Sequence, residues 1–254
     1  MANALQTLFG NIADAIREKT GDTATMKPAE FASAISEISG GSAGGSDGAD
    51  LLVQYVNGDV SSWTTLPAGI TKISDYAFYG CSDLDLTSLP AGIISIGNNA
   101  FNGCSDLTLT SLPAGITKIG DYAFYNCTKL ALTSLPDGLI NITSSVFYNC
   151  TNLALTSLPD GVVSIDGYAF YNCTKLALTS LPDGLASKIG NYAFNNCTGL
   201  TEITFKGKPS SISSTCFWGC TNLLTINVPW AEGAVSGAPW GATNATINYN
   251  YTGE

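Results

Sequence analysis

Histidine is absent from the 254-residue sequence, and charged residues make up only 12% of it. The chain therefore lacks the side chain most often used as a general base, and common zinc sites lose their nitrogen ligand. No run of 18 apolar residues occurs, which argues against a membrane-spanning helix. Acidic residues outnumber basic ones by 20 to 10, and the resulting net charge of −10 disfavours binding to nucleic acid or anionic lipid.

Familiar catalytic and targeting motifs are missing as well. The sequence contains no P-loop, no G-x-S-x-G and no dinucleotide fingerprint, so we do not expect an enzyme or a bound cofactor. The first residues, MANALQTLFGNIADAIREKTG, show no basic region ahead of an apolar stretch, and we expect no Sec signal peptide.

The sequence consists mainly of one repeated unit. The segment IGDYAFYNCTKLALTSLPDG, residues 119–138, recurs almost unchanged at residues 165–184. A Leu-Pro pair begins every 23 residues, at Leu66, Leu89, Leu112, Leu135, Leu158 and Leu181. A fixed period of this length is the signature of a solenoid, in which each repeat is one coil stacked on its neighbours. We predict an α/β repeat solenoid of about seven coils, with short parallel strands and short helical or 3₁₀ segments.

Each unit also carries one phenylalanine and one cysteine at fixed positions. The phenylalanines are Phe78, Phe101, Phe124, Phe147, Phe170, Phe194 and Phe217, and the cysteines are Cys81, Cys104, Cys127, Cys150, Cys173, Cys197 and Cys220. Cysteines stacked in parallel are poorly oriented for disulfides, whereas a free cysteine behaves as a small buried hydrophobe. The pattern predicts a core spine of phenylalanine beside a structural column of reduced thiols.

Within a middle unit, the apolar pattern assigns local structure. Leu130 and Leu132 alternate with smaller residues, which predicts a short strand with both leucines facing inward. Phe124 and Cys127 follow at one-turn spacing, which predicts a helical or 3₁₀ segment. The aspartates after proline, Asp137, Asp160 and Asp183, are interpreted as turn residues. The asparagines before cysteine, Asn126, Asn149, Asn172 and Asn196, are interpreted as a ladder that bonds neighbouring coils.

Units of the form L-P-x-G-[IV]-x-x-I-x-x-x-A-F-x-x-C-x-x-L resemble the BspA-type leucine-rich repeats of bacterial surface proteins. The resemblance implies a leucine-rich-repeat rod with a binding role. The first five units read L-x-L-x-x-L-P, as in LALTSLP, where the family more often reads L-x-x-I-x-[IL]-P. The last two, LTEITFKGKP and LLTINVP, keep the usual form. This difference leaves the register of the inner strands open.

Four regions follow from these patterns. Residues 1–38 predict a helical hairpin for anchoring or oligomerisation, because so small a unit hardly buries a core of its own; the alternative is a hairpin folded onto the solenoid end. Residues 39–50 form a flexible Gly/Ser linker. Residues 51–229 form the solenoid with an amino-terminal cap. Residues 230–254 form a carboxyl-terminal β cap, in which ATINYNY alternates like a strand.

The two terminal segments resemble virion proteins of phages and prophages from gut Gram-positive bacteria. The residues that carry this resemblance are LQTLFGNIADAIREKTG near the start and NVPWAEGAVSGAPWGATNATINYN near the end. It implies a virion location, with other virion or tail proteins bound through residues 1–38 and homo-oligomers formed by the helices. The alternatives are a cell-surface adhesin of the BspA kind that binds host matrix proteins, and a purely structural virion spacer.

Two columns of mostly tyrosine and asparagine flank the phenylalanine and cannot both face inward. Their aromatic members are Tyr76, Tyr122, Tyr168 and Tyr192 in one column, and Tyr79, Tyr125, Tyr148, Tyr171 and Trp218 in the other. Tyrosine supplies rigid, amphipathic contact area. We predict that these residues bind a bacterial cell-surface polysaccharide or protein; the alternative is that the rings shield the coil edges. A small acidic cluster, Asp83, Asp85 and Asp106, is either a weak calcium site or a solvated face.

Overall fold

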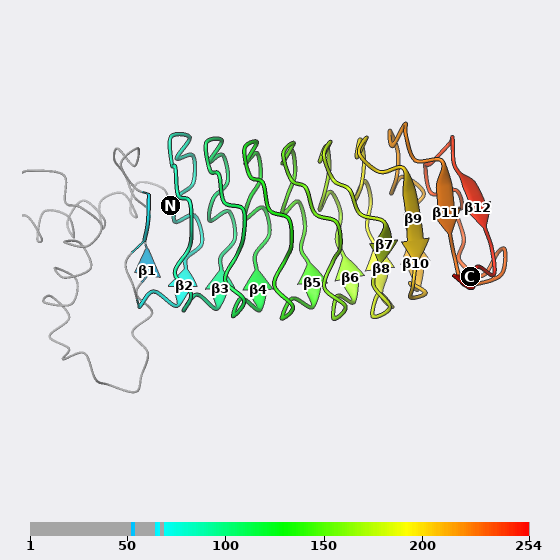
Figure 1. The fold of residues 1–254 in the computed structure, drawn as a ribbon, viewed down its shortest axis with the longest axis horizontal. Helices are drawn as coiled ribbons and strands as arrows, with labels where there is room; N and C mark the ends of the chain where they lie inside the picture. The colour runs from blue at the N-terminus through cyan, green and yellow to red at the C-terminus, as the bar shows by residue number, and fades with distance from the viewer. Residues whose placement is uncertain (1–51, 54–63, 67–68, 254) are drawn as a thin grey trace, which may run out of the picture. The chain divides into compact units, whose positions relative to one another are not determined.

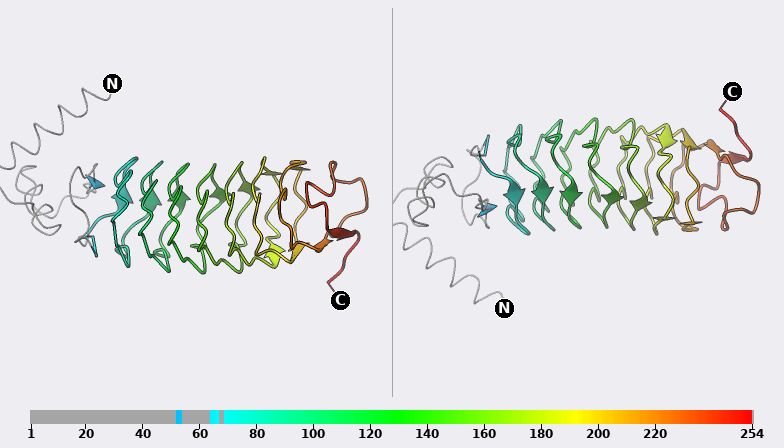
Figure 2. Two further views of the ribbon diagram at one scale, coloured as in Figure 1. Left: turned by 90° about the horizontal axis from the view of Figure 1, so that it is seen from above. Right: turned by 90° about the horizontal axis from the view of Figure 1, so that it is seen from below.

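The computed structural model describes residues 52–53, 64–66 and 69–253. The predicted helical hairpin 1–38, the linker 39–50 and most of the amino-terminal cap lie outside these residues. The described chain is a parallel β-solenoid whose coils of about 23 residues stack along one axis (Figure 1). Figure 2 shows the same stack from above and below, with each coil lying against the next along the rod.

All assigned strands are short and pair in parallel. They are β1 (Leu52–Val53), β2 (Lys72–Ile73), β3 (Ser95–Ile96), β4 (Lys118–Ile119), β5 (Asn141–Ile142), β6 (Ser164–Ile165), β7 (Ser180–Leu181), β8 (Lys188–Ile189), β9 (Glu202–Phe205), β10 (Ser211–Ile212), β11 (Thr225–Asn227) and β12 (Thr246–Asn248). They form three four-stranded sheets, ordered β1-β2-β3-β4, β10-β8-β6-β5 and β12-β11-β9-β7. None of the described residues lies in a helix, so this part of the chain offers no helix that crosses a membrane.

The first two sheets use the same position of successive coils. In each coil from β2 onward a buried isoleucine follows a more polar residue, and the isoleucines pair with one another, as in Ile73↔Ile96. The unit between Phe170 and Phe194 is one residue longer than the rest, yet Ile165 still pairs with Ile189. The extra residue is therefore absorbed outside the strands.

The strand ladder is interrupted between β4 and β5, which belong to different sheets. At this join the Thr143 hydroxyl donates to the carbonyls of Ile119 (3.1 Å) and Gly120 (3.0 Å). Gly120 is required here, because a Cβ at this position would lie 2.5 Å from the backbone nitrogen of Asn98 in the preceding coil. The two halves of the rod are thus joined partly by a side chain.

The leucine-rich half of the coil differs from the prediction. Leu130 and Leu132 are fully buried as expected, but they lie outside any strand. Here the Ala131 N–H donates to the Leu109 carbonyl (3.1 Å), and this segment does not continue into a ladder. Strands β9 and β11 form in the two units that keep the usual family pattern, and β7 precedes them. The first two LALTSLP segments are therefore extended without strand pairing, whereas the last one, residues 176–182, contains β7, which pairs with β9.

The predicted helical or 3₁₀ segments are wrong, because residues 121–126 form a series of turns. The amide groups alternate in direction: those of Ala123, Tyr125 and Cys127 donate to carbonyls three residues back. Those of Phe124 and Asn126 donate instead to carbonyls of the next coil, at 2.9 and 2.8 Å. A 3₁₀ helix needs consecutive bonds of the first kind, so bonding between coils prevents it.

The predicted phenylalanine spine is confirmed. Phe124 stacks on Phe147 and Phe147 on Phe170, with ring centroids 5.7 and 5.6 Å apart. The stack extends from Phe78 to Phe217 with interplanar angles of 4° to 14°. Each ring is almost completely buried, as are the leucines and isoleucines around it. The core is a continuous column of stacked rings and aliphatic side chains.

Seven cysteines lie in this core and Cys81, at the first coil, is partly exposed. Each column cysteine from Cys104 onward donates its thiol proton to a phenylalanine carbonyl of the preceding coil, as from Cys127 to Phe101 at 3.0 Å. All eight are free thiols. The cysteines therefore contribute both apolar volume and a weak hydrogen bond between coils.

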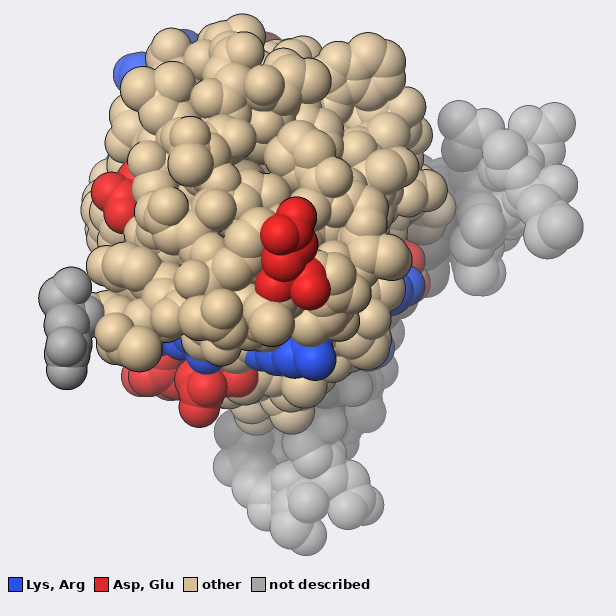
Figure 3. All heavy atoms as spheres, turned by 90° about the vertical axis from the view of Figure 1, so that its right-hand side faces the viewer, with Lys and Arg blue, Asp and Glu red and all other residues tan. Residues whose placement is uncertain are grey.

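The carboxyl-terminal segment continues the stack. The strand expected in ATINYNY is present as β12, which pairs with β11 through Ile226↔Ile247 and its neighbours. Trp240 is fully buried against Phe205, and its indole N–H donates to the Ser236 carbonyl at 2.8 Å. Viewed from this end, the described surface is largely uncharged, with one acidic group near the middle of the view and the other charged side chains near its edges (Figure 3).

Candidate ligand-binding surfaces

The first tyrosine column lies in an unusual backbone conformation. Tyr76, Tyr122, Tyr168 and Tyr192 have φ between 55° and 60°. Asn99 and Ser145 occupy the same position in two coils, also at positive φ. This left-handed region costs roughly 1–2 kcal/mol for a residue with a Cβ, and asparagine or glycine adopts it more readily. Four tyrosines are therefore placed where the backbone favours a smaller residue.

The second column forms a stack of rings along the rod. Tyr148 lies between Tyr125 and Tyr171, with centroids 4.5 and 4.4 Å away and interplanar angles of 13° and 2°. Burial raises the pKa of the Tyr148 hydroxyl, and the two neighbouring phenols add to this rise. Trp218 extends the aromatic surface by stacking on Tyr192 of the first column at 5.8 Å.

The two columns form one aromatic surface, which we call the tyrosine face. Its members are the nine predicted binding residues Tyr76, Tyr79, Tyr122, Tyr125, Tyr148, Tyr168, Tyr171, Tyr192 and Trp218. Rings of the two columns contact each other within a coil, as between Tyr122 and Tyr125 at 5.9 Å. Trp218 is 56% exposed, and Tyr76, Tyr79, Tyr122 and Tyr168 are exposed as well. The remaining four are half-buried. Seven of the nine residues form a continuous series of ring contacts from Tyr122 to Trp218. Tyr76 and Tyr79 contact each other, and the coil that carries Asn99 and Asn102 separates them from the rest.

The asparagine ladder beside this face is confirmed between three coils. The Asn149 side-chain amide donates to Asn126 Oδ1 at 3.0 Å, and that of Asn172 donates to Asn149 Oδ1 at 2.7 Å. These asparagines also have φ near 58°, where Gly80, Gly103 and Gly219 stand in other coils. The ladder therefore holds the turn that carries the tyrosines.

The three acids of the predicted cluster bind separate partners. Asp83 accepts from the Ser82 hydroxyl (2.8 Å), Asp85 from the Thr108 hydroxyl (3.1 Å), and Asp106 pairs with Lys129 (2.9 Å). Among the residues that the structure describes, no group of three or more potential metal-ligating side chains occurs. The cluster is a solvated face with local hydrogen bonds.

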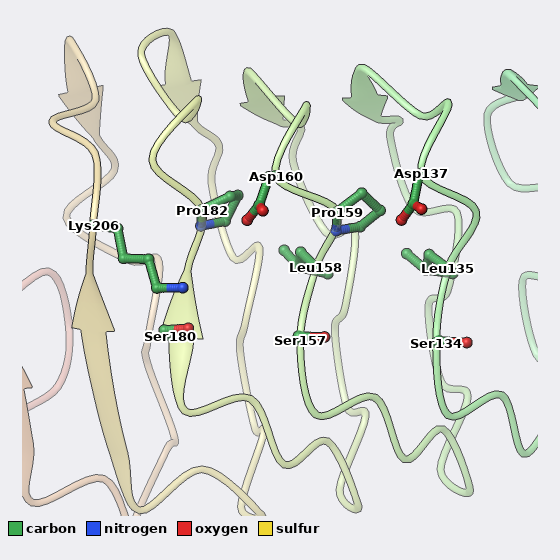
Figure 4. Close-up of a pocket in the computed structure, with 10 residues that line it drawn as sticks. All are labelled: Ser134, Leu135, Asp137, Ser157, Leu158, Pro159, Asp160, Ser180, Pro182 and Lys206. Carbon is green, nitrogen blue, oxygen red and sulfur yellow. The ribbon is translucent and has the colours of Figure 1, made fainter.

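A groove that the sequence did not predict as a site lies on the leucine-rich half of the coils. It has a volume of about 240 Å³ and spans successive coils (Figure 4). Its floor contains the buried residues Leu135, Leu158, Pro159 and Pro182. Its polar lining is Ser134, Ser157, Ser180, Asp137, Asp160 and Lys206. The available signal was the nonapeptide LALTSLPDG, which occurs without change at residues 130–138, 153–161 and 176–184.

The aspartates of this groove are not needed for the turn that they were expected to stabilise. In coils with aspartate, the Leu139 N–H donates to the Pro136 carbonyl at 3.2 Å. In coils with alanine after proline, the Ile116 N–H donates to the Pro113 carbonyl at 3.1 Å in the same way. Asp137, Asp160 and Asp183 thus lie in turns, as interpreted, but the same turn forms with alanine and does not depend on the carboxylate.

Comparison with known families assigns the repeat. The BspA type leucine rich repeat region matches residues 57–177 and 141–232, in six copies. The chain therefore belongs to the BspA-type leucine-rich repeat family. Repeat proteins of this type are generally non-enzymatic binding proteins. The match ends at residue 232 and so leaves out the first segment that resembles virion proteins and most of the second, and that resemblance gains no support from it.

Solved structures include similar proteins. A leucine-rich repeat protein from T. pallidum, TpLRR, is 31% identical, with 63% of this chain and 76% of that chain covered and a TM-score of 0.54. A leucine-rich repeat protein from Bacteroides ovatus is 24% identical, with 73% and 59% covered and a TM-score of 0.45. A leucine rich cell surface protein from Faecalibacterium prausnitzii is 21% identical, with 74% and 79% covered and a TM-score of 0.40. The first similarity supports the solenoid fold. No curated protein sequence matches the chain.

Proposed function

We propose that the chain is a non-enzymatic binding protein whose tyrosine face recognises a repeating polymer on a bacterial cell surface, either polysaccharide or protein. The observation that carries this proposal is the row of four tyrosines at positive φ. A backbone position that favours glycine or asparagine keeps a large ring at a cost in stability. Such local strain is typical of residues retained for function rather than for folding.

The spacing of the rings suits a repeating ligand. Successive rings of the second column lie 4.4–4.5 Å apart from Tyr125 to Tyr171, so neighbouring coils offer nearly equivalent contacts. Each phenol combines apolar area with a hydroxyl at its tip, which fits both sugar rings and peptide groups. Several weak, equivalent contacts along one polymer give high avidity without a strong single site.

Two settings are compatible with this activity. In the first, which we favour, residues 1–38 attach the chain to other virion or tail proteins, and the solenoid binds the bacterial host. In the second, the chain is a cell-surface adhesin that binds host matrix proteins. The first predicts binding to bacterial cell walls, and the second predicts binding to matrix proteins such as fibronectin, so one panel of probes separates them.

The triple variant Tyr125→Ala/Tyr148→Ala/Tyr171→Ala tests the tyrosine face. Removing three aromatic anchors of roughly 2 kcal/mol each should lower affinity more than tenfold. Binding of the full chain to purified Gram-positive cell walls and to fibronectin measures the effect. The matched control is Thr133→Ala/Thr156→Ala/Thr179→Ala, which changes three exposed residues on another part of the same coils. Equal binding by the two triple variants would show that the tyrosine face does not bind these ligands.

Tyr122→Asn tests whether the strained tyrosine is kept for binding. Asn99 occupies the equivalent position of the preceding coil, so the backbone accepts asparagine. We expect unfolding free energy to stay level or rise by up to about 1 kcal/mol, because the left-handed conformation costs asparagine less. Affinity for the polymer should fall. Urea unfolding measures the first quantity, and a clear loss of stability would show that the ring serves the fold.

A further inference from the structure

The groove on the leucine-rich half is lined by polar side chains without partners in the fold. The side chains of Ser134, Ser157, Asp137, Asp160 and Lys206 take part in no hydrogen bond or ion pair with the residues that the structure describes. All five are exposed. Elsewhere on the rod many comparable groups bond across coils, as Asp75 does with the backbone N–H of Asn98 at 2.8 Å. The groove thus presents a row of donors and acceptors available to a ligand.

Two of the three aspartates that follow Leu-Pro, Asp137 and Asp160, line the groove. The residue after Leu-Pro is alanine in the first three units, at Ala68, Ala91 and Ala114, and aspartate in the next three. Because the turn forms with either residue, the fold does not explain this change. Asp137 and Asp160 each contribute a negative charge without a partner in the fold to the chain's net charge of −10. The change is explained if the carboxylates contact a ligand.

The lining favours one class of ligand. Carboxylates only accept hydrogen bonds, an ammonium group only donates them, and serine hydroxyls do both. A ligand matching this mixture along successive coils carries groups that both donate and accept. Anionic polymers are repelled by the unpaired carboxylates. The buried leucine and proline residues of the floor provide apolar contact. The groove's volume of about 240 Å³ is smaller than the roughly 300–1,000 Å³ of sites for drug-sized ligands.

We propose that this groove is a second binding site, which takes a neutral oligosaccharide. Sugar hydroxyls donate to Asp137 and Asp160, accept from Lys206, and exchange hydrogen bonds with the serines, while ring C–H groups lie on the apolar floor. The side chains that make these contacts project from neighbouring coils into one groove (Figure 4).

This site is separate from the tyrosine face. Asp137 follows Tyr125 by about half of a coil, so the two surfaces lie on different sides of the rod. The proposal therefore stands or falls independently of the tyrosine face, and variants of each surface distinguish the two.

Asp137→Ala/Asp160→Ala in the full chain is the decisive variant. Alanine at the equivalent positions of other coils forms the same turn, so thermal stability should be unchanged. On an array of neutral, amino-sugar and acidic oligosaccharides, we expect wild type to bind neutral members and the variant to lose at least tenfold in affinity. The Tyr125→Ala/Tyr148→Ala/Tyr171→Ala variant should retain this binding. Ala114→Asp, which extends the aspartate row by one coil, should strengthen binding to longer oligosaccharides.

A charge-matched control separates specific contacts from net charge. Asp83→Asn/Asp85→Ala removes two carboxylates elsewhere, and Asn152 and Ala131 occupy the equivalent positions of later coils. This control should bind neutral oligosaccharides like wild type. The proposal is overturned if the groove variant binds them as well as wild type does, or if the control loses affinity equally. It is also overturned if the wild-type groove binds only calcium or basic peptides in calorimetric titrations.

Discussion

Phe147→Ala should lower the free energy of unfolding by about 3–5 kcal/mol, the range for truncating a fully buried phenylalanine. The ring of Phe147 is 1% exposed and stacks on both Phe124 and Phe170. Its loss leaves a cavity that these neighbours cannot fill without breaking the backbone bonds between coils. The coil also lies next to the interruption between β4 and β5, where strand pairing gives the least support.

Urea unfolding followed by tryptophan fluorescence and circular dichroism measures this loss. Because repeat proteins gain stability from contacts between neighbouring coils, the variant should also show a broader or two-step transition. Thr156→Ala, an exposed change in the same unit, is the control and should alter stability by less than about 0.5 kcal/mol. A Phe147→Ala protein that unfolds within 1 kcal/mol of wild type, on the scale of a surface substitution, would contradict the stacked spine.

The second large effect is loss of stability in alkaline solution. Burial raises the pKa of Cys127, Cys150 and Cys173 well above the ordinary value of 9.0, with a further rise from neighbouring thiols. Burial also raises the pKa of Cys220 to about 12. In the unfolded chain these thiols ionise near pH 9, while in the folded chain they stay protonated. Their contribution to stability is therefore fully present below pH 9 and is lost as pH rises toward the folded-state pKa values.

The size of the effect follows from the number of buried thiols. Each contributes about 1.4 kcal/mol per pH unit once the unfolded state is ionised. Seven buried cysteines together give a slope on the order of 10 kcal/mol per pH unit. We expect unfolding between pH 9 and about 11, measured by circular dichroism in the presence of a thiol reductant, which prevents disulfide formation in the unfolded chain.

The slope of stability against pH separates thiols from other alkaline groups. Cys127→Ala/Cys150→Ala should reduce it by roughly 3 kcal/mol per pH unit, because two ionising groups are removed from the unfolded state. The Tyr148→Phe variant is the control, since Tyr148 also has a raised pKa but is only one group. An unchanged slope in the cysteine variant would assign the alkaline transition to tyrosine and lysine instead.

The repeat period was sufficient to predict the solenoid and its core. Phe124, Cys127, Leu130 and Leu132 were placed inside from spacing alone, and each is buried. This succeeds because any side chain repeated at the coil period must stack on its own copies. The period therefore places equivalent side chains in one column, and the apolar character of phenylalanine, leucine and cysteine places those columns inside.

The hydrogen bonds between coils were harder to predict from the sequence. The pattern of Ala123, Phe124 and Cys127 fits a helical turn, but it does not reveal that alternate amides bond to the next coil. The prediction of a strand at Leu130 was wrong for a related reason. Leu130 and Leu132 are more buried than Ala131 between them, as in a strand, but the segment forms no ladder of backbone hydrogen bonds with neighbouring coils. Partners one coil away do not appear in a local pattern, so inward orientation was predictable and strand assignment was not.

The candidate sites were likewise predictable only in part from the sequence. The tyrosine columns were found because large aromatic residues recur at positions that cannot all be internal. The positive φ of the first column was not predicted, because tyrosine carries no local signal for that conformation. The groove was missed because serine, proline and aspartate read as ordinary turn residues, and only the matching turns of alanine coils show that aspartate is dispensable there.

Because equivalent atoms of successive coils pair with one another, the gene can gain or lose whole repeat units without disrupting the rod. An in-frame duplication or deletion of one unit leaves two joining surfaces that already match, so the product still closes its core. The longer unit between Phe170 and Phe194 indicates that even a single added codon is tolerated when it falls outside the strands. Slippage during replication would therefore vary the length of the rod, and with it the reach of every row of side chains, in steps of a single coil.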